Sequence, residues 1–406
     1  MMFKLRRFPY PFKCALSISS DIDNASSLES FIAVMDYFNS QNDTPFGEGL
    51  GLEVGNSFWF YNNSESEQLS YFDGLSENLS PLAPLIEEYW KSGHIDTLHS
   101  WGNFDAGRFN RSHAESALSV LRKHKVKIPI WINHGIGLNH QKVGNYRNMH
   151  GDDPDHPAYH MDLTTEAGCE YFWIGKTTHI IGQDADHTLS VYTKRIIQWL
   201  MKHTRYRNVI DPIYDVGNQL CASIRFRDGT QGWEFTRFIN AWGRENILDV
   251  NELATQLSPR IINQLIKNRG FMILYTHFNE HVKMTGLPQL LIKHLDYLKR
   301  KTIDKTVFMT TTSRLLKYKE MRENLIFQTQ IMNDEMEIHV SKEIETPVGI
   351  KLVKHEHLQG LTFYTDSPKK TKILFEQTPV KISVNSKDET GKQSVSIPWI
   401  KLNYPR

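Results

Sequence analysis

The chain has 406 residues, more than one ordinary hydrophobic core can organise, and we therefore expect one large domain and one smaller domain. Its 40% hydrophobic and 23% charged residues are typical of globular proteins and exclude a disordered, collagen-like or coiled-coil chain. The 47 basic and 46 acidic side chains leave a formal net charge of +1, so no overall field would attract nucleic acid or an anionic membrane.

The cysteines and the N-terminal segment indicate the cellular compartment in which we expect the protein. Cys14, Cys169 and Cys221 lie far apart without a CxxC spacing, which argues against a zinc ribbon or a disulfide framework and favours a reducing compartment. Residues 1–13 are basic, but charged residues and prolines interrupt every apolar run, so neither a signal peptide nor a spanning helix is indicated. We therefore expect a cytoplasmic protein without membrane insertion.

Strand and helix patterns alternate along most of the chain. A buried strand at 14–19 precedes helical spacing at 26–39, and a second strand at 49–60 precedes a helix at 82–91. Further helices are expected at 112–125, 189–203, 257–268 and 287–300, and further strands at 128–132, 219–226, 271–275 and 306–311. Such alternation requires crossover connections and a parallel sheet. For residues 1–320 the economical arrangement is a (β/α) barrel, either regular or distorted to seven strands.

Two regions depart from this alternation. Residues 139–157, which include DDPDHP, read as a long irregular loop, a kind of segment that often has a function. In residues 325–406 the short runs EMEIHV, GIKLVK, LTFYT, KILF, VKISV and SVSIPWI are separated by turn-forming residues. We expect this second region to form a small antiparallel β domain.

Asp21 and Asp23 stand at the end of the first predicted strand, where a turn could bring both carboxylates into one pocket. One carboxylate could then bind a metal while the other accepts a proton from water. Alternatively, the two aspartates, followed by Asn24 and Ser26, could cap the next helix, because Asp, Asn and Ser are favoured at that position. The local pattern alone supports both interpretations equally.

The segment GHIDTLHSWGN at 93–103 favours the metal interpretation. His99 and Asn103 are four positions apart and would lie on one side of a helical turn. Together with SSDID at 19–23, this segment resembles the polysaccharide deacetylase (NodB homology, carbohydrate esterase 4-like) family, whose corresponding motifs are TFDDG and HSxxH. The resemblance covers roughly residues 15–314. It implies Asp21 as general base and Asp23 and His99 as metal ligands, with Asn103 in the place of the second histidine.

The resemblance extends to FMILYTH at 271–277, which is similar to the Leu-x-His motif of the family. It implies that His277 protonates the leaving group, although a polar loop residue would show the same pattern. IWINHG at 130–135 occupies the place of the RPPxG motif but lacks its arginine. Asn133 and His134 could bind the substrate there, or His134 could be the third ligand. Arg227 or Arg237 could supply the missing positive charge near Asp21, and a solvated loop would explain them equally well.

The resemblance implies a metal-dependent hydrolase that removes an N-acyl group from an amino sugar, with zinc as the expected ion and a carbohydrate as the partner. Trp101, Trp131 and Trp173 lie near the motifs and could stack on sugar rings, although we expect at least one of the three to be a core residue. Two alternatives stay open. The chain could be a carbohydrate-binding barrel without activity, or it could hydrolyse another non-peptide C–N bond.

Overall fold

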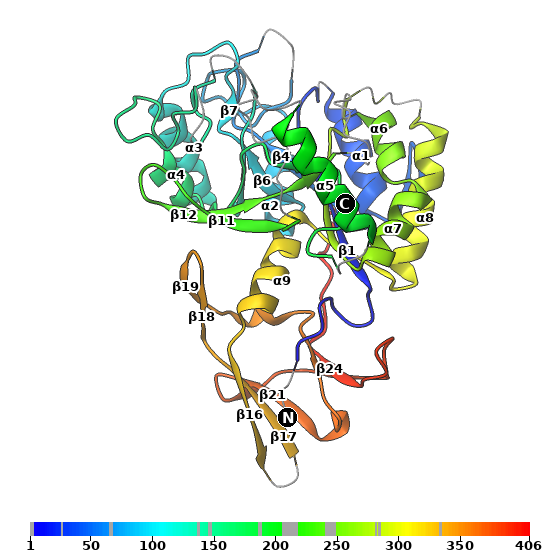
Figure 1. Cartoon of the computed structure of the whole chain (residues 1–406). Helices are drawn as coiled ribbons and strands as arrows, with labels where there is room; N and C mark the ends of the chain where they lie inside the picture. The colour runs from blue at the N-terminus through cyan, green and yellow to red at the C-terminus, as the bar shows by residue number, and fades with distance from the viewer. Residues whose placement is uncertain are drawn as a thin grey trace.

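The computed structural model describes residues 4–25, 27–64, 68–135, 139–144, 148–185, 189–204, 218–239, 249–280, 282, 286–332 and 335–406. Strands and helices alternate through the first part of these ranges, and short strands dominate after residue 326 (Figure 1). None of the described helices combines the length and the apolar character that a membrane crossing requires.

One large sheet organises the first part of the chain. Its strands are β1 (Cys14–Ser20), β4 (Gly55–Phe58), β6 (Ile95–His99), β8 (Ile130–Ile132), β9 (Tyr171–Trp173), β10 (Thr177–Thr178), β11 (Cys221–Arg225), β12 (Gln231–Phe235), β13 (Arg237–Phe238), β14 (Phe271–Thr276) and β15 (Val307–Met309). Ten of them follow the order β10–β13–β14–β1–β4–β6–β8–β9–β12–β11. β15 pairs with the first half of β1, and β4 pairs with its second half. All pairings are parallel except the β11–β12 hairpin.

This sheet curls into a half-barrel and stays open within the described ranges, with β10 and β11 at its two ends. The expectation of a mixed α/β fold with a parallel sheet is confirmed, whereas a closed (β/α) barrel is not. Closure would require the two end strands to pair along a common register. β10 is only two residues long and β11 runs antiparallel to its neighbour, so neither offers the parallel edge that a (β/α) barrel closes with.

Helices cover the sheet and supply two of its hydrophobic cores. They are α1 (Leu28–Asn39), α2 (Ala83–Ser92), α3 (Arg111–His124), α4 (Met161–Glu166), α5 (Leu189–His203), α6 (Val250–Gln256), α7 (Pro259–Asn268), α8 (Gln289–Ile303) and α9 (Thr312–Asn324). α3 illustrates why these segments are helical: its buried residues Ala114, Ala117, Leu118 and Leu121 recur at the spacing of one helix face. The predicted helix at 189–203 has the bounds that the structure gives it.

The predicted strand at 49–60 is shorter in the structure. Only Gly55–Phe58 pairs in the large sheet, as β4. Gly51 takes a φ of +58°, a left-handed conformation that interrupts an extended chain. Short pairs flank this region: β2 (Asp43–Thr44) pairs with β3 (Gly47–Glu48), and β5 (Tyr61–Asn62) pairs with β7 (Gly102–Asn103).

The C-terminal region forms small sheets that are separate from the large one. β16 (Phe327–Met332), β17 (Glu335–Val340), β21 (Thr371–Phe375) and β22 (Thr378–Pro379) form one, β18 (Glu343–Thr346) and β19 (Gly349–Leu352) another, and β20 (Thr362–Tyr364), β24 (Ser394–Ser396) and β23 (Ser383–Asn385) a third. The 3-10 helices η1 (His355–Leu358) and η2 (Pro368–Lys370) lie between them in sequence. The expected antiparallel pattern holds except between β17 and β21, which are parallel because the chain crosses other strands before it returns.

The two ends of the chain each contact the other region (Figure 1). Near the N-terminus, Leu5 forms a bridge with Phe363 of β20. Near the C-terminus, the Tyr404 ring stacks on Tyr89 of α2, and its hydroxyl donates a hydrogen bond to Asp36 of α1 at 2.7 Å. The division into domains at 1–320 and 325–406 stays a prediction, and these contacts cross it.

Glu320 of α9 connects the C-terminal region with the large sheet. Its carboxylate accepts hydrogen bonds from Tyr171 of β9 at 2.7 Å and from Trp233 of β12 at 2.8 Å. It also forms ion pairs with Lys317 and with Lys351 of β19. Burial alone would raise the pKa of Glu320, but the two lysines outweigh it and lower the pKa to about 2.

We predict that Glu320→Gln destabilises the protein by about 3 kcal/mol at neutral pH, since removing one partner of a buried ion pair leaves the others uncompensated. The folded pKa lies below that of an unfolded glutamate, about 4.3. The stabilisation is therefore present above that pH and is lost as the pH falls toward 2. Denaturant unfolding at several pH values measures both effects.

The control is Glu356→Gln, because the Glu356 side chain is 67% exposed. It should change stability little at any pH. A Glu320→Gln deficit that stays constant between pH 7 and pH 3 would contradict this account.

Candidate metal centre

Five polar side chains with catalytic or ligating chemistry lie at the ends of four strands of the large sheet. His99 ends β6, His134 follows β8, His277 follows β14, and Asp21 and Asp23 follow β1. β14, β1, β4, β6 and β8 are consecutive and parallel, so their carboxyl ends meet at one edge of the sheet. This edge is where α/β folds place their binding sites.

The turn after β1 presents both aspartates to this edge. The Asp21 N–H donates to the Thr276 carbonyl at 2.9 Å, which continues the ladder between β1 and β14. The α1 helix is capped by Ser27, whose side chain accepts a hydrogen bond from the Ser30 N–H. The alternative in which the two aspartates cap this helix is therefore wrong. Ser26, considered with them, lies outside the described residues.

Asp23, His99 and His134 converge on one point. One Asp23 oxygen, Oδ2, lies 3.1 Å from His99 Nδ1, and the other, Oδ1, lies 3.1 Å from His134 Nδ1. The two imidazole rings are nearly perpendicular, with their centres 4.7 Å apart. Donor atoms bound to one tetrahedral zinc ion lie about 3.4 Å apart, given bonds of about 2.0–2.2 Å. The three side chains are thus already close to a ligating arrangement.

Unpaired polar atoms at this point support an ion. Asp23 Oδ2 and His99 Nδ1 are buried, and neither has a hydrogen-bond partner, because their contact lacks hydrogen-bond geometry. Buried polar atoms without partners cost free energy, which a bound cation would offset. Two imidazoles and one carboxylate form a donor set that zinc accepts in catalytic sites. The residues present therefore fit a divalent metal ion.

Asn103 has a different environment from the one that the sequence suggested. The segment from His99 to Asn103 is not a helical turn, because Ser100 takes a φ of 53° and Asn103 belongs to β7, which pairs with β5. The Asn103 amide oxygen accepts the N–H of Asp105 at 3.2 Å. Ser100 Oγ instead accepts the N–H of His134 at 3.0 Å, which holds His134 in the third position beside Asp23.

Arg237 forms a buried, two-pronged ion pair with Asp21. Its Nη1 and Nη2 donate to the two carboxylate oxygens at 2.9 and 3.0 Å, and Nη2 also donates to Ser19 Oγ at 2.8 Å. The guanidinium lies over the rings of Trp173 and Tyr275, at 4.3 and 4.6 Å from their centres. Arg237 thus provides a positive charge beside Asp21, where the sequence lacks the arginine of the third motif. This pair fixes the orientation of the carboxylate.

His277 lies near the second carboxylate oxygen of Asp23, whereas His134 lies beside the first. Its Nδ1 is 2.9 Å from Glu280 Oε2, and its Nε2 is 3.3 Å from the Tyr275 hydroxyl and 3.9 Å from Asp23 Oδ2. Burial alone would lower the pKa of His277. The hydrogen bond with Glu280 and the charges of Asp23 and Asp21 outweigh burial, so the net shift raises the pKa. Glu280 was not selected from the sequence, because its contact with His277 depends on the turn between them.

The pKa shifts of Asp23 and His99 favour the protonation states in which these side chains can bind a metal ion. Burial lowers the pKa of His99 to about 4, so this imidazole is neutral at neutral pH. Burial opposes the charge of Asp23, but the neighbouring imidazoles outweigh it and lower the pKa of that carboxyl. The pKa of His134 is raised because Asp23 outweighs burial there. A metal ion would take the place of the His134 proton.

An aromatic side chain packs against the two candidate histidine ligands. Trp59, which the sequence did not single out, stacks on the His99 ring with centres 5.3 Å apart and meets the His134 ring edge-on at 4.9 Å. Trp101 has no exposed surface and packs against Trp131, so it has no face on which a sugar could stack. Trp101 is therefore a core residue in this structure.

Asn133 is likewise engaged inside the protein. Its side-chain nitrogen donates to the Val143 carbonyl at 2.8 Å, and its oxygen accepts hydrogen bonds from Trp131 Nε1 and the Val143 N–H. These three contacts attach the loop after β8 and leave little of the amide for a substrate. Asn133 thus supports His134 from the adjacent position.

Comparison with known proteins adds no assignment: no family model matches the chain, and no curated protein matches it.

We expect substitutions of the three candidate ligands to weaken the binding of a metal ion at this centre. Asp23→Ala, His99→Ala and His134→Ala should each lower Zn²⁺ affinity by at least about 100-fold, since even residues that only support a ligand contribute 10–100-fold. Asn103→Ala should retain the ion. Metal content after dialysis and titration of the stripped protein measure these effects, and circular dichroism checks folding. Retention by His134→Ala together with loss in Asn103→Ala would instead make Asn103 the third ligand.

Proposed function

We propose that this chain is a metal-dependent hydrolase of the polysaccharide deacetylase type, which removes an N-acyl group from an amino sugar. The observation that carries the proposal is the convergence of Asp23, His99 and His134, with an unpaired carboxylate oxygen and an unpaired ring nitrogen at the same point. Asp21 and His277 flank this point. A ligand group with a base and an acid beside it is an arrangement suited to metal-assisted amide hydrolysis.

Asp23, His99 and His134 would hold a divalent ion, which would supply Lewis acidity toward the acyl carbonyl and the attacking water. Asp21 accepts the proton of the attacking water, and Arg237 keeps its carboxylate turned into the site. His277 donates a proton to the departing amine nitrogen, and Glu280 fixes its ring through Nδ1. Water is consumed, the C–N bond breaks, and the products are a carboxylate and a free amino sugar.

An amino sugar as substrate is implied by the family resemblance alone. Hydrolysis is also supported by the grouping of Asp23, His99 and His134. Two departures from the family pattern favour an inactive carbohydrate-binding protein: Asn103 in place of a histidine, and the missing arginine. Against that alternative, His134 lies beside Asp23 and Arg237 pairs with Asp21. Zinc as the ion and a cytoplasmic location stay predictions.

Activity can be measured with the full chain, Zn²⁺ and N-acetylated chitooligosaccharides, with released acetate as the readout. We expect release that a chelator abolishes. Asp21→Asn and His277→Gln should lower kcat by roughly 10²–10⁴-fold, the usual contribution of general acid–base catalysis, without loss of the bound ion.

The matched control is His355→Gln, which replaces an exposed histidine of η1 and should leave acetate release unchanged. Binding of the oligosaccharide without acetate release would favour the inactive alternative. Hydrolysis of a cyclic amide, with neither binding nor cleavage of the oligosaccharide, would favour another C–N substrate. Full activity of Asp21→Asn would refute the assigned base.

A further inference from the structure

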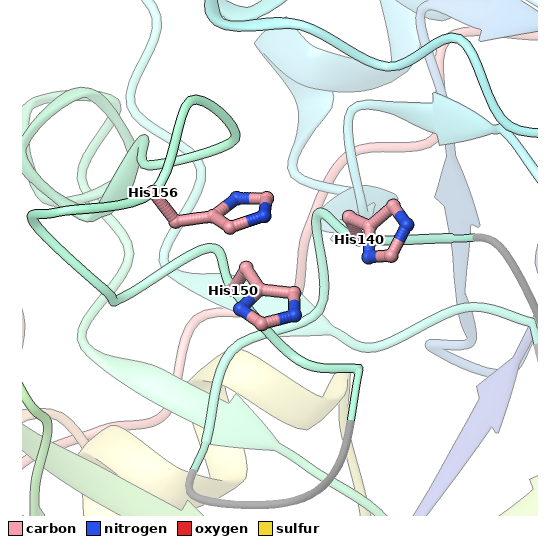
Figure 2. A group of neighbouring side chains, drawn as sticks. All are labelled: His140, His150 and His156. Carbon is pink, nitrogen blue, oxygen red and sulfur yellow. The ribbon is translucent and has the colours of Figure 1, made fainter.

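Three histidines outside the candidate centre gather in the loop between β8 and α4. His140, His150 and His156 each offer a ring nitrogen within 4.8 Å of the others. Figure 2 shows the rings of His150 and His156 side by side, with His140 beside them. None of the three takes part in the proposed hydrolysis.

Backbone hydrogen bonds and one partly buried ion pair connect the described parts of this loop. The His150 N–H donates to the His140 carbonyl at 3.0 Å, so the two residues lie next to each other on neighbouring runs of chain. Asp152, which is fully buried, accepts the Gly144 N–H at 3.0 Å and a guanidinium nitrogen of Arg227 at 2.6 Å. The framework of the histidine cluster is therefore set before any ion binds.

The rings leave donor atoms without partners. His140 Nδ1 and His150 Nδ1 are buried and have no hydrogen bond. The nearest carboxylate oxygen, Asp153 Oδ2, is 3.5 Å from His150 Nδ1, beyond a good hydrogen bond. The His150 and His156 rings stack with centres 3.9 Å apart, and His140 lies 5.3 and 5.7 Å from them. Unpaired nitrogens on adjacent rings are what a metal ion would satisfy.

Two rings of the cluster, His140 and His156, favour the neutral form. Burial, followed by the neighbouring histidines, lowers the pKa of His140 and of His156. Neutral imidazole suits zinc, copper and nickel, whereas magnesium and calcium prefer oxygen donors. We propose that His140, His150 and His156 form a second divalent metal site, for Zn²⁺ or a similar ion, separate from the Asp23 centre. Asp153 or water completes the coordination.

The three ligands are not equivalent. His156 Nδ1 accepts the N–H of Ala158 at 3.0 Å, which requires the neutral ring to carry its proton on Nε2. Binding an ion through Nε2 moves that proton to Nδ1 and breaks the contact with Ala158. The stacked rings must also turn so that their in-plane lone pairs meet at one ion. His156 is therefore the weakest of the three ligands.

The position of the loop gives the site a structural role. Asn139 and Gln141, on either side of His140, are both fully buried. Asn139 Nδ2 donates to the His134 carbonyl at 3.1 Å, and Gln141 accepts the Trp101 N–H at 2.8 Å. An ion on the histidine cluster would stiffen the segment that supports His134. This second site does not depend on the proposed hydrolysis.

Zn²⁺ titration of the stripped full chain tests the proposal. The wild type should bind two ions. The double variant Asp23→Ala/His99→Ala, which lacks the first centre, should bind one. In that background, His140→Ala and His150→Ala should each weaken Zn²⁺ binding by at least about 100-fold, and His156→Ala by less. Mg²⁺ should not replace Zn²⁺.

His355→Ala in the same background is the matched control and should keep the remaining ion. His150→Gln provides a second variant of similar size in case an alanine change unfolds the loop. The proposal is overturned if the double variant binds no Zn²⁺, or if His150→Gln retains full affinity. Because ions are counted without an assay of activity, failure to deacetylate a sugar would leave this result intact.

Discussion

The arrangement of the candidate centre depends on the parallel pairing of β1 with its neighbours. β1 is buried along its whole length and pairs with β14 on one side and with β15 and β4 on the other. The register that sets Ser20 opposite Thr276 also sets the turn carrying the aspartates next to His277. A shift by one residue would turn these side chains to the other face of the sheet. The positions of the candidate residues therefore depend on backbone hydrogen bonds within the sheet.

The charged side chains at the carboxyl ends of these strands are largely buried, and Asp21 and Asp23 have different partners. Asp21 and Arg237 are both almost fully buried and satisfy each other through two hydrogen bonds, with aromatic rings around the guanidinium. Asp23 lies beside the imidazoles of His99 and His134, and its Oδ2 has no hydrogen-bond partner among the described residues. A buried ion pair contributes little net stability compared with apolar residues of similar volume, although removing one partner alone is strongly destabilising. The two aspartates therefore differ in their surroundings: a guanidinium fixes Asp21, whereas Asp23 lies among imidazoles.

The C-terminal strands stabilise the fold away from this edge. They share a third hydrophobic core with the early part of β1 and with α9. That core contains Ala15, whereas the candidate centre lies beyond Ser20, so the two ends of β1 contribute to different parts of the molecule. Glu320 adds an ionic contact to the same core. This separation of stabilising and chemical ends is common in sheets whose strands run parallel.

The sequence by itself determined the features that depend on local patterns. The alternation of strands and helices, the strand ends near Asp21, His134 and His277, and the β-rich C-terminal region follow from periodicity and turn residues. The strand β6 that ends at His99 does not, because the sequence suggested a helical turn there. The open edge of the sheet, by contrast, depends on how β10 and β11 pair, which involves strands far apart in sequence.

Only the tertiary structure decided how the centre is completed. His134 lies beside Asp23 because Ser100 takes a left-handed conformation and binds the His134 backbone, which no spacing of residues indicates. Arg237 reaches Asp21 across 216 positions of sequence. Contacts of this kind arise from strand register and side-chain packing, and these are settled only when the whole sheet forms.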